Sequence, residues 1–163
     1  MNLPGCSRTL TPSPPATCGS ASDRKTIRCD TRLTTKRKLQ KVGHGPEFSV
    51  HTSDLWVWEG VDGRDYCVTG TWGANGDAIF WDVTDPSRIE RIATVTVDAR
   101  TVNDVKVSED GRICIISREG ASNRKNGIVA YDVSDPKKPK RLTQYDDELT
   151  GGVHNIFIHK GYA

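Results

Sequence analysis

Three short segments place polar residues at the start of apolar runs, about fifty residues apart. They are Ser53-Asp54, Asn103-Asp104 and His154-Asn155, and His51 precedes the first of them. Imidazole and carboxylate groups that converge in a fold can together hold a divalent ion. If the three segments lie side by side, they form a partial ring of polar groups. We therefore predict a ligand or metal site shared by His51, Asp54, Asp104 and His154, with His51, Asp104 and His154 as the candidate metal ligands.

The same residues also have a structural interpretation. Asp and Asn side chains at strand starts commonly accept hydrogen bonds from nearby backbone N–H groups. A position that recurs in every unit favours this role, since binding sites are usually asymmetric. His154 is the strongest candidate for binding, because the residues aligned with it are Ser53 and Asn103. The sequence leaves both interpretations open.

A second group of candidates is cationic. The segment 117–127 contains three cations, among them Arg118 and Arg124, and Arg100 is expected on the same face. Such a group attracts an anionic ligand, while the other interpretation is a charged loop in solvent. The glycines of this segment do not follow a strand and open a helix, so a phosphate-binding loop is not indicated.

Recognisable catalytic motifs are not found. The sequence has no Gly-x-Ser-x-Gly elbow, no His-Glu-x-x-His and no convincing Cys–His pair. We therefore assign no catalytic residue and no required cofactor, and the identity of any cofactor stays unknown. Aromatic stripes typical of RNA-binding proteins are also missing, so no nucleic-acid partner is expected. The strand aromatics are instead expected to pack inside the fold: Trp56, Trp58, Trp81 and Tyr131.

A repeat of fifty residues must position the candidates. The segment 79–86, Ile-Phe-Trp-Asp-Val-Thr-Asp-Pro, recurs at 129–136 as Val-Ala-Tyr-Asp-Val-Ser-Asp-Pro. At the same offset, 54–57 matches 104–107, and a third copy begins at Val153. Each unit predicts four short strands separated by turn signals. We expect strands at 54–58, 65–70, 77–82 and 89–97, then at 103–107, 112–117, 127–132 and 139–145, and one more at 154–159.

Four strands per 40–50 residues are typical of a β-propeller blade. Asp62-Gly63 and Asp110-Gly111 are expected as hairpin turns, because glycine adopts a positive φ at little cost. The strand alternation gathers one set of loops on one side, which we call the loop face. It comprises 51–53, 71–75 with Trp72, 98–103, 117–126 and 146–152.

The two copies of the Asp-Val-(Ser/Thr)-Asp-Pro segment resemble LVIVD-repeat β-propellers. The resemblance covers about residues 48–163, or two and a quarter blades: blade 1 at about 54–97, blade 2 at about 103–145 and the start of blade 3 at about 153–163. It implies a bacterial or archaeal protein that is exported or attached to the cell surface. A propeller needs about 4–8 blades to close. We therefore expect an incomplete propeller, a fragment or truncated product that is able to self-associate.

Composition divides the chain into two parts. Residues 1–45 carry a net charge of +7, contain no aromatic residue and are rich in Ser, Thr and Pro. We expect this basic head to be disordered, because it cannot bury enough apolar surface. Residues 46–163 carry a net charge of −5 and all eleven aromatic residues, and they are expected to form the partial propeller. No signal peptide is visible, and no apolar run reaches the roughly 18 residues of a membrane span.

These observations favour a non-enzymatic repeat module that presents its loop face to a protein or small ligand. The alternative is a metal-binding or enzymatic propeller, an oxidase or hydrolase, whose site at the channel mouth is completed by further blades. The ligand, the compartment and the total number of blades are not determined by the sequence.

Overall fold

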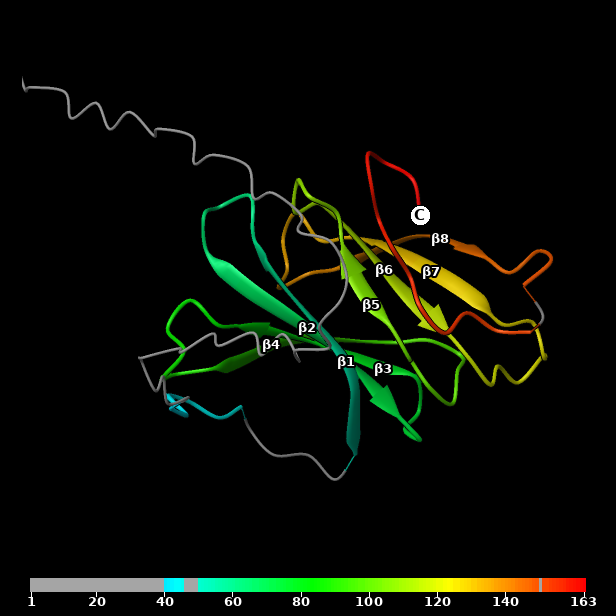
Figure 1. Cartoon of the computed structure of the whole chain (residues 1–163), viewed down its shortest axis with the longest axis horizontal. Helices are drawn as coiled ribbons and strands as arrows, with labels where there is room; N and C mark the ends of the chain where they lie inside the picture. The colour runs from blue at the N-terminus through cyan, green and yellow to red at the C-terminus, as the bar shows by residue number, and fades with distance from the viewer. Residues whose placement is uncertain (1–39, 46–49, 150) are drawn as a thin grey trace, which may run out of the picture. The chain divides into compact units, whose positions relative to one another are not determined.

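The computed structural model describes residues 40–45, 50–149 and 151–163. Most of the expected basic head, residues 1–39, lies outside the described residues, as do 46–49 and 150. Eight strands form two antiparallel four-stranded sheets, and the described residues contain no helix (Figure 1). The expectation of an all-β fold is therefore confirmed. The strands are β1 (His51–Glu59), β2 (Asp65–Trp72), β3 (Asp77–Asp82), β4 (Glu90–Thr96), β5 (Val105–Val107), β6 (Ile113–Arg118), β7 (Gly127–Asp132) and β8 (Lys140–Tyr145).

Each sheet is a meander in which consecutive strands are neighbours, in the orders β1-β2-β3-β4 and β5-β6-β7-β8. We call them sheet 1 and sheet 2. The predicted hairpin turns are present: Gly63 has a φ of 75° and Gly111 a φ of 70°. These are left-handed values that strain residues with a side chain. Strand β1 begins at His51, three residues earlier than expected, and its register shifts between Thr52 and Leu55.

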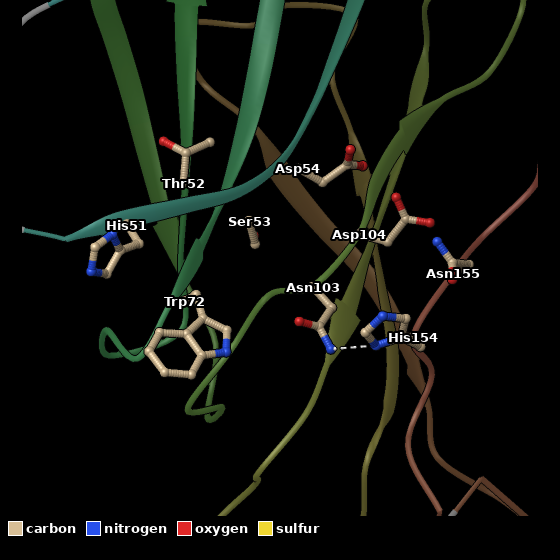
Figure 2. Close-up of a pocket in the computed structure, with 9 residues that line it drawn as sticks. All are labelled: His51, Thr52, Ser53, Asp54, Trp72, Asn103, Asp104, His154 and Asn155. Carbon is tan, nitrogen blue, oxygen red and sulfur yellow. Dashed lines mark hydrogen bonds between the residues drawn. The ribbon is translucent and has the colours of Figure 1, made fainter.

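The segment that was expected to form a ninth strand, 154–159, is not a strand. Its only bridge is an isolated one between His159 and Tyr162. The segment instead runs past the start of sheet 2, where the backbone N–H of Ile156 donates a hydrogen bond to the Asp104 carboxylate. Figure 2 shows Asn155 beside Asp104. A strand requires a ladder of hydrogen bonds with a neighbouring strand. In the described residues, the segment 154–159 has no such ladder, and it is joined to the start of sheet 2 by the hydrogen bond to Asp104.

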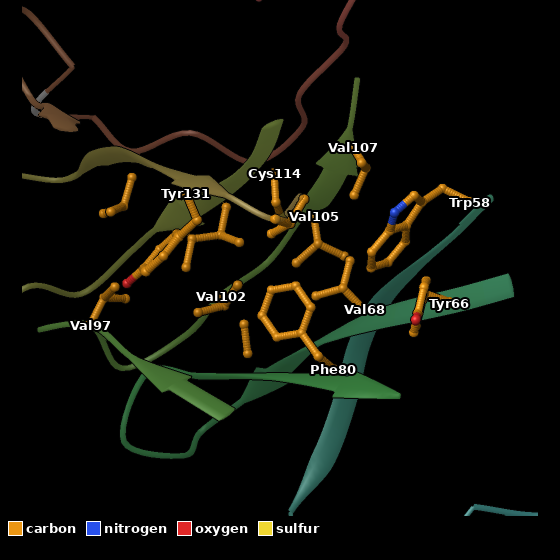
Figure 3. Close-up of a cluster of buried hydrophobic side chains, with 14 of the residues drawn as sticks. Trp58, Tyr66, Val68, Phe80, Val97, Val102, Val105, Val107, Cys114 and Tyr131 are labelled. Atoms are coloured by element: carbon orange, nitrogen blue, oxygen red, sulfur yellow. The ribbon is translucent and has the colours of Figure 1, made fainter. Parts of the chain in front are cut away.

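The main hydrophobic core lies between the two sheets (Figure 3). Val68 and Phe80 of sheet 1 face Cys114, Val129 and Tyr131 of sheet 2, and all five are buried. Burial raises the pKa of the Cys114 thiol to about 12, so the thiol is neutral, as expected for a small buried apolar residue.

The aromatic residues differ from the prediction at one position. Trp58 is buried beside Tyr66 and Phe80, with ring centroids 5.7 and 6.3 Å away. Trp56, two residues earlier on the same strand, was also expected to pack inside the fold. Its ring centroid lies 5.1 Å from the charged amine of Lys106, and the residue is 38% exposed.

A smaller apolar cluster covers the other face of sheet 1. Trp81 packs there with Cys67 and Ile79, because alternate residues of a strand point to opposite faces. The indole N–H of Trp81 donates to Thr69 Oγ1 at 3.0 Å. A Cβ atom added at Gly45, at the end of the basic head, would lie 3.4 Å from the Trp81 ring. Gly45 therefore lies beside this face of sheet 1.

The repeated Asp-Val-(Ser/Thr)-Asp-Pro segment forms the same turn after β3 and after β7. Asp82 Oδ1 accepts from the backbone N–H of Thr84 at 3.1 Å, and Asp132 Oδ1 accepts from that of Ser134 at 2.9 Å. The second aspartate of each segment makes a similar bond two residues onward. The two aspartates of the segment therefore recur because in each copy their side chains accept the backbone hydrogen bonds that stabilise the turn.

Candidate ligand-binding site

A polar pocket of about 530 Å³ opens where the three aligned segments meet. Strand β1 supplies one side, the approach to β5 supplies another, and the segment after residue 151 supplies the third (Figure 2). The end of β2 adds an exposed indole. The lining residues are His51, Thr52, Ser53, Asp54, Trp72, Asn103, Asp104, His154 and Asn155.

The structure therefore brings together six of the nine site residues expected from the sequence. His51, Asp54, Trp72, Asn103, Asp104 and His154 line the pocket, whereas Arg100, Arg118 and Arg124 do not. The alignment of the repeats predicted that the three aligned segments lie next to one another. In the structure these segments line the same pocket.

The two aspartates of the pocket connect one repeat to the next. Asp54 Oδ2 accepts from the backbone N–H of Val105 at 3.2 Å. Asp104 Oδ2 accepts from the backbone N–H of Ile156. The donors lie 51 and 52 residues after their acceptors, so the same contact recurs in both units. The carboxylates thus have the structural role considered for them, as acceptors for backbone N–H groups.

Lys106 is a functional neighbour that the sequence analysis missed. Its Nζ lies 2.8 Å from Asp54 Oδ2, forms an ion pair with Asp104 and donates to the carbonyl of Val105. It also lies 5.1 Å from the ring centroid of Trp56, a cation–π distance. The signal was available, since the sequence predicts a strand at 103–107, in which Asp104 and Lys106 are two residues apart and share a face.

These contacts move the pKa values of the two carboxyl groups in opposite directions. Burial alone raises the pKa of Asp54, but hydrogen bonds with Asp104, Lys106 and the Val105 N–H outweigh it and lower the value to about 2. Burial and the neighbouring Asp54 raise the pKa of Asp104, against Lys106 and the Ile156 N–H. The carboxylates raise the pKa of Lys106, although its burial acts the other way. Lys106 therefore stays charged.

The three candidate metal ligands do not converge. Among the residues that the structure describes, no group of three His, Cys, Asp or Glu side chains is arranged to hold a metal ion. The ring of His51 instead contacts the edge of Trp72, with centroids 6.2 Å apart. His154 Nδ1 lies 3.0 Å from Asn103 Nδ2, and the Asp104 oxygens contact Lys106 and backbone N–H groups.

The contact between Asn103 and His154 orients the imidazole ring and selects its tautomer. An amide nitrogen donates and does not accept, so His154 Nδ1 is the acceptor and the proton is on Nε2. The same amide nitrogen donates to Glu119 Oε2, which fixes the orientation of the amide. Glu119, also missed from the sequence, is held by its backbone bridge to Thr101.

The three arginines of the predicted anion-binding group differ in their surroundings. The Arg118 side chain is 3% exposed and donates to the Asp98 carboxylate, the Asp98 carbonyl and the Lys125 carbonyl. Its charge is therefore used to hold the loop 117–126 in place. Arg100 and Arg124 are exposed, and Arg124 occupies a turn with a φ of 59°. The sequence showed the cations but not the acidic and carbonyl partners that surround Arg118.

Comparisons with known proteins do not assign the chain to a family. No family model matches the sequence, and no curated protein matches it significantly. In the part of the chain that the structure describes, no helix is long and apolar enough to span a membrane. The function is therefore inferred from the geometry of the pocket.

Proposed function

We propose that this chain is a repeat module of an LVIVD-type β-propeller whose loop face binds a ligand without catalysing a reaction. Support for the propeller comes from the fifty-residue repeat and from two successive four-stranded meanders. Further support comes from the contact of one first strand with the next through Asp54 and Lys106. In propellers of four-stranded blades, this arrangement surrounds a central channel.

The pocket at the meeting point of the three units carries the proposal of ligand binding. It combines the exposed indole of Trp72 with the Asn103 amide and the His154 imidazole. The amide is oriented by its contact with Glu119, and the imidazole by its contact with the amide. A small number of well-placed polar groups beside an aromatic surface is the usual composition of a binding pocket. The carboxylates Asp54 and Asp104 are engaged by Lys106 and backbone N–H groups, and so they support the pocket wall.

One observation favours the alternative, an enzymatic propeller. Asp54 and Asp104 are neighbouring carboxyl groups whose pKa values are moved apart, a pattern found in acid–base pairs of enzymes. In this reading Asp104, the group with the raised pKa, is the acid and Asp54 the base. The ion pairs with Lys106 weigh against it, because the carboxylate oxygens are already engaged by an ammonium group.

The proposal is tested with a fixed panel of probes added to the full 163-residue chain: neutral sugars, short peptides, nucleosides, inorganic phosphate and divalent metal ions. Binding is followed by NMR through the imidazole C–H signals of His51 and His154. We expect saturable shifts with at least one class of probe other than the metal ions, and their loss in Trp72→Ala. Leu142→Ala is the matched control, since Leu142 is equally exposed on β8 and lies outside the pocket.

Two results contradict the proposal. One is that no class of probe shifts either histidine. The other is a stoichiometric metal that is lost in His154→Ala, which supports the metal-binding alternative.

A further inference from the structure

We infer that the ligand of this pocket is a neutral carbohydrate, an inference that rests on the proposed binding function. The charges of the pocket are the first argument. Its lining contains neither Lys nor Arg, so an anionic group finds no cationic partner there. The oxygens of Asp54 and Asp104 already accept from Lys106, Val105 and Ile156. A cation therefore competes with an ammonium group that is already in place, and a neutral ligand meets neither obstacle.

The hydrogen-bonding groups are the second argument. Because His154 Nδ1 accepts from Asn103, the ring presents its Nε2–H as a donor. The Asn103 amide nitrogen is engaged by Glu119 and His154, which leaves the amide oxygen as an acceptor. Figure 2 shows this oxygen on the side of the amide away from His154, toward Trp72. A hydroxyl both donates and accepts, so adjacent hydroxyls of a sugar match this pair of groups.

The exposed indole is the third argument. Trp72 is 54% exposed at the end of β2, and the edge contact with the His51 ring supports its orientation. A flat aromatic surface offers apolar contact area together with a polar edge. A pyranose has a face of C–H groups and a rim of hydroxyls. Its C–H face is suited to contact the Trp72 indole, and its hydroxyls are suited to bond Asn103 and His154.

A peptide is a less suitable occupant. Its side chains require apolar subsites, and the pocket offers one aromatic side chain among eight polar ones. A nucleotide requires a partner for its phosphate, which the lining does not contain. The chemistry of this pocket therefore favours a polyhydroxylated ring over a peptide or a nucleotide.

The experiment is a titration of the 163-residue chain with glucose, galactose, mannose, N-acetylglucosamine and their β- and α-linked oligomers. The imidazole C–H signals of His51 and His154 report binding in every variant, and the Trp72 indole N–H signal reports it in the chains that keep this residue. We expect at least one sugar to give a saturable shift, and Trp72→Ala to weaken its binding tenfold or more. Trp72→Phe keeps a flat ring and is expected to retain part of the affinity. Leu142→Ala is expected to bind as the unmodified chain does. Glucuronate, paired with glucose, is expected to bind no better than glucose.

The outcomes separate the two proposals. If peptides, nucleosides or phosphate bind in a Trp72-dependent way and sugars do not, the carbohydrate assignment is wrong and the pocket remains a binding site. If glucuronate binds tenfold better than glucose, the argument from charge is wrong. If none of the probes shifts the Trp72, His51 or His154 signals, both the carbohydrate assignment and the binding function are contradicted.

Discussion

Replacing Asp104 with alanine removes a buried acceptor that serves three donors. The side chain is 3% exposed and accepts from the backbone N–H groups of Val105 and Ile156 and from Lys106. Val105 and Lys106 keep Asp54 as a second acceptor, so the Ile156 N–H alone loses its partner. A hydrogen bond to a charged group contributes about 1.5–3 kcal/mol. Removing one partner of a buried ion pair costs about 3–5 kcal/mol when the other is left alone.

Because Lys106 remains paired, we expect Asp104→Ala to lower the free energy of unfolding by about 2–3 kcal/mol. The measurement is urea unfolding followed by circular dichroism, with native-state hydrogen exchange of the Ile156 amide as a local readout. Asp104→Asn retains an amide oxygen for the Ile156 N–H and is expected to cost less. Asp135→Ala is the control, because Asp135 is an exposed aspartate that accepts one backbone N–H.

Two results would refute this reasoning. One is an Asp104→Ala variant that unfolds with the same free energy as Asp135→Ala. The other is an Ile156 amide that exchanges at an unchanged rate, which would mean that the carboxylate does not connect the third repeat to the second.

Three further predictions concern acid stability, the outer cluster and the core thiol. The pKa of Asp54 is about 2 in the folded chain against 3.8 as its ordinary value, so its contribution to stability is present above pH 4 and lost between about pH 4 and 2. Asp54→Asn should flatten this part of the acid-unfolding curve, and an unchanged slope would contradict the Lys106 contact. Trp81→Ala should cost about 3–5 kcal/mol in urea unfolding, and a loss below about 1 kcal/mol would show that the indole is not buried. The Cys114 thiol, fully buried and with a pKa of about 12, should react with iodoacetamide only after denaturation, as measured by mass spectrometry of its peptide.

The strands were predictable because their signals are local. Alternating apolar residues, Asp-Gly turns and prolines after the third strand of each unit placed all eight strands within a few residues. The convergence of Asp54, Asp104 and His154 was predictable from the repeat, since equivalent positions of stacked units lie side by side. Local sequence patterns were sufficient to predict the strands, and the fifty-residue repeat was sufficient to predict which residues converge.

The misplaced residues depend on partners that are distant in sequence. Lys106 aligns with Trp56 in the repeat, so the comparison of units concealed a charged residue between two carboxylates. Arg118 was expected to attract a ligand, but Asp98, twenty residues earlier, already neutralises it. The segment 154–159 has the apolar pattern of a strand, yet a strand also requires a paired neighbour, which a pattern alone does not guarantee.

The contacts from Asp54 to Val105 and from Asp104 to Ile156 have a direction. The first and second units each supply an aspartate as the acceptor, and the unit that follows supplies a backbone N–H as the donor at its aligned position. A tandem duplication of one unit therefore copies acceptor and donor together, so the new copy meets a compatible partner on both sides from the moment it arises. An array linked in this way lengthens by copying alone, and the sequence of each copy is then free to diverge in its loops while the connecting aspartate is retained.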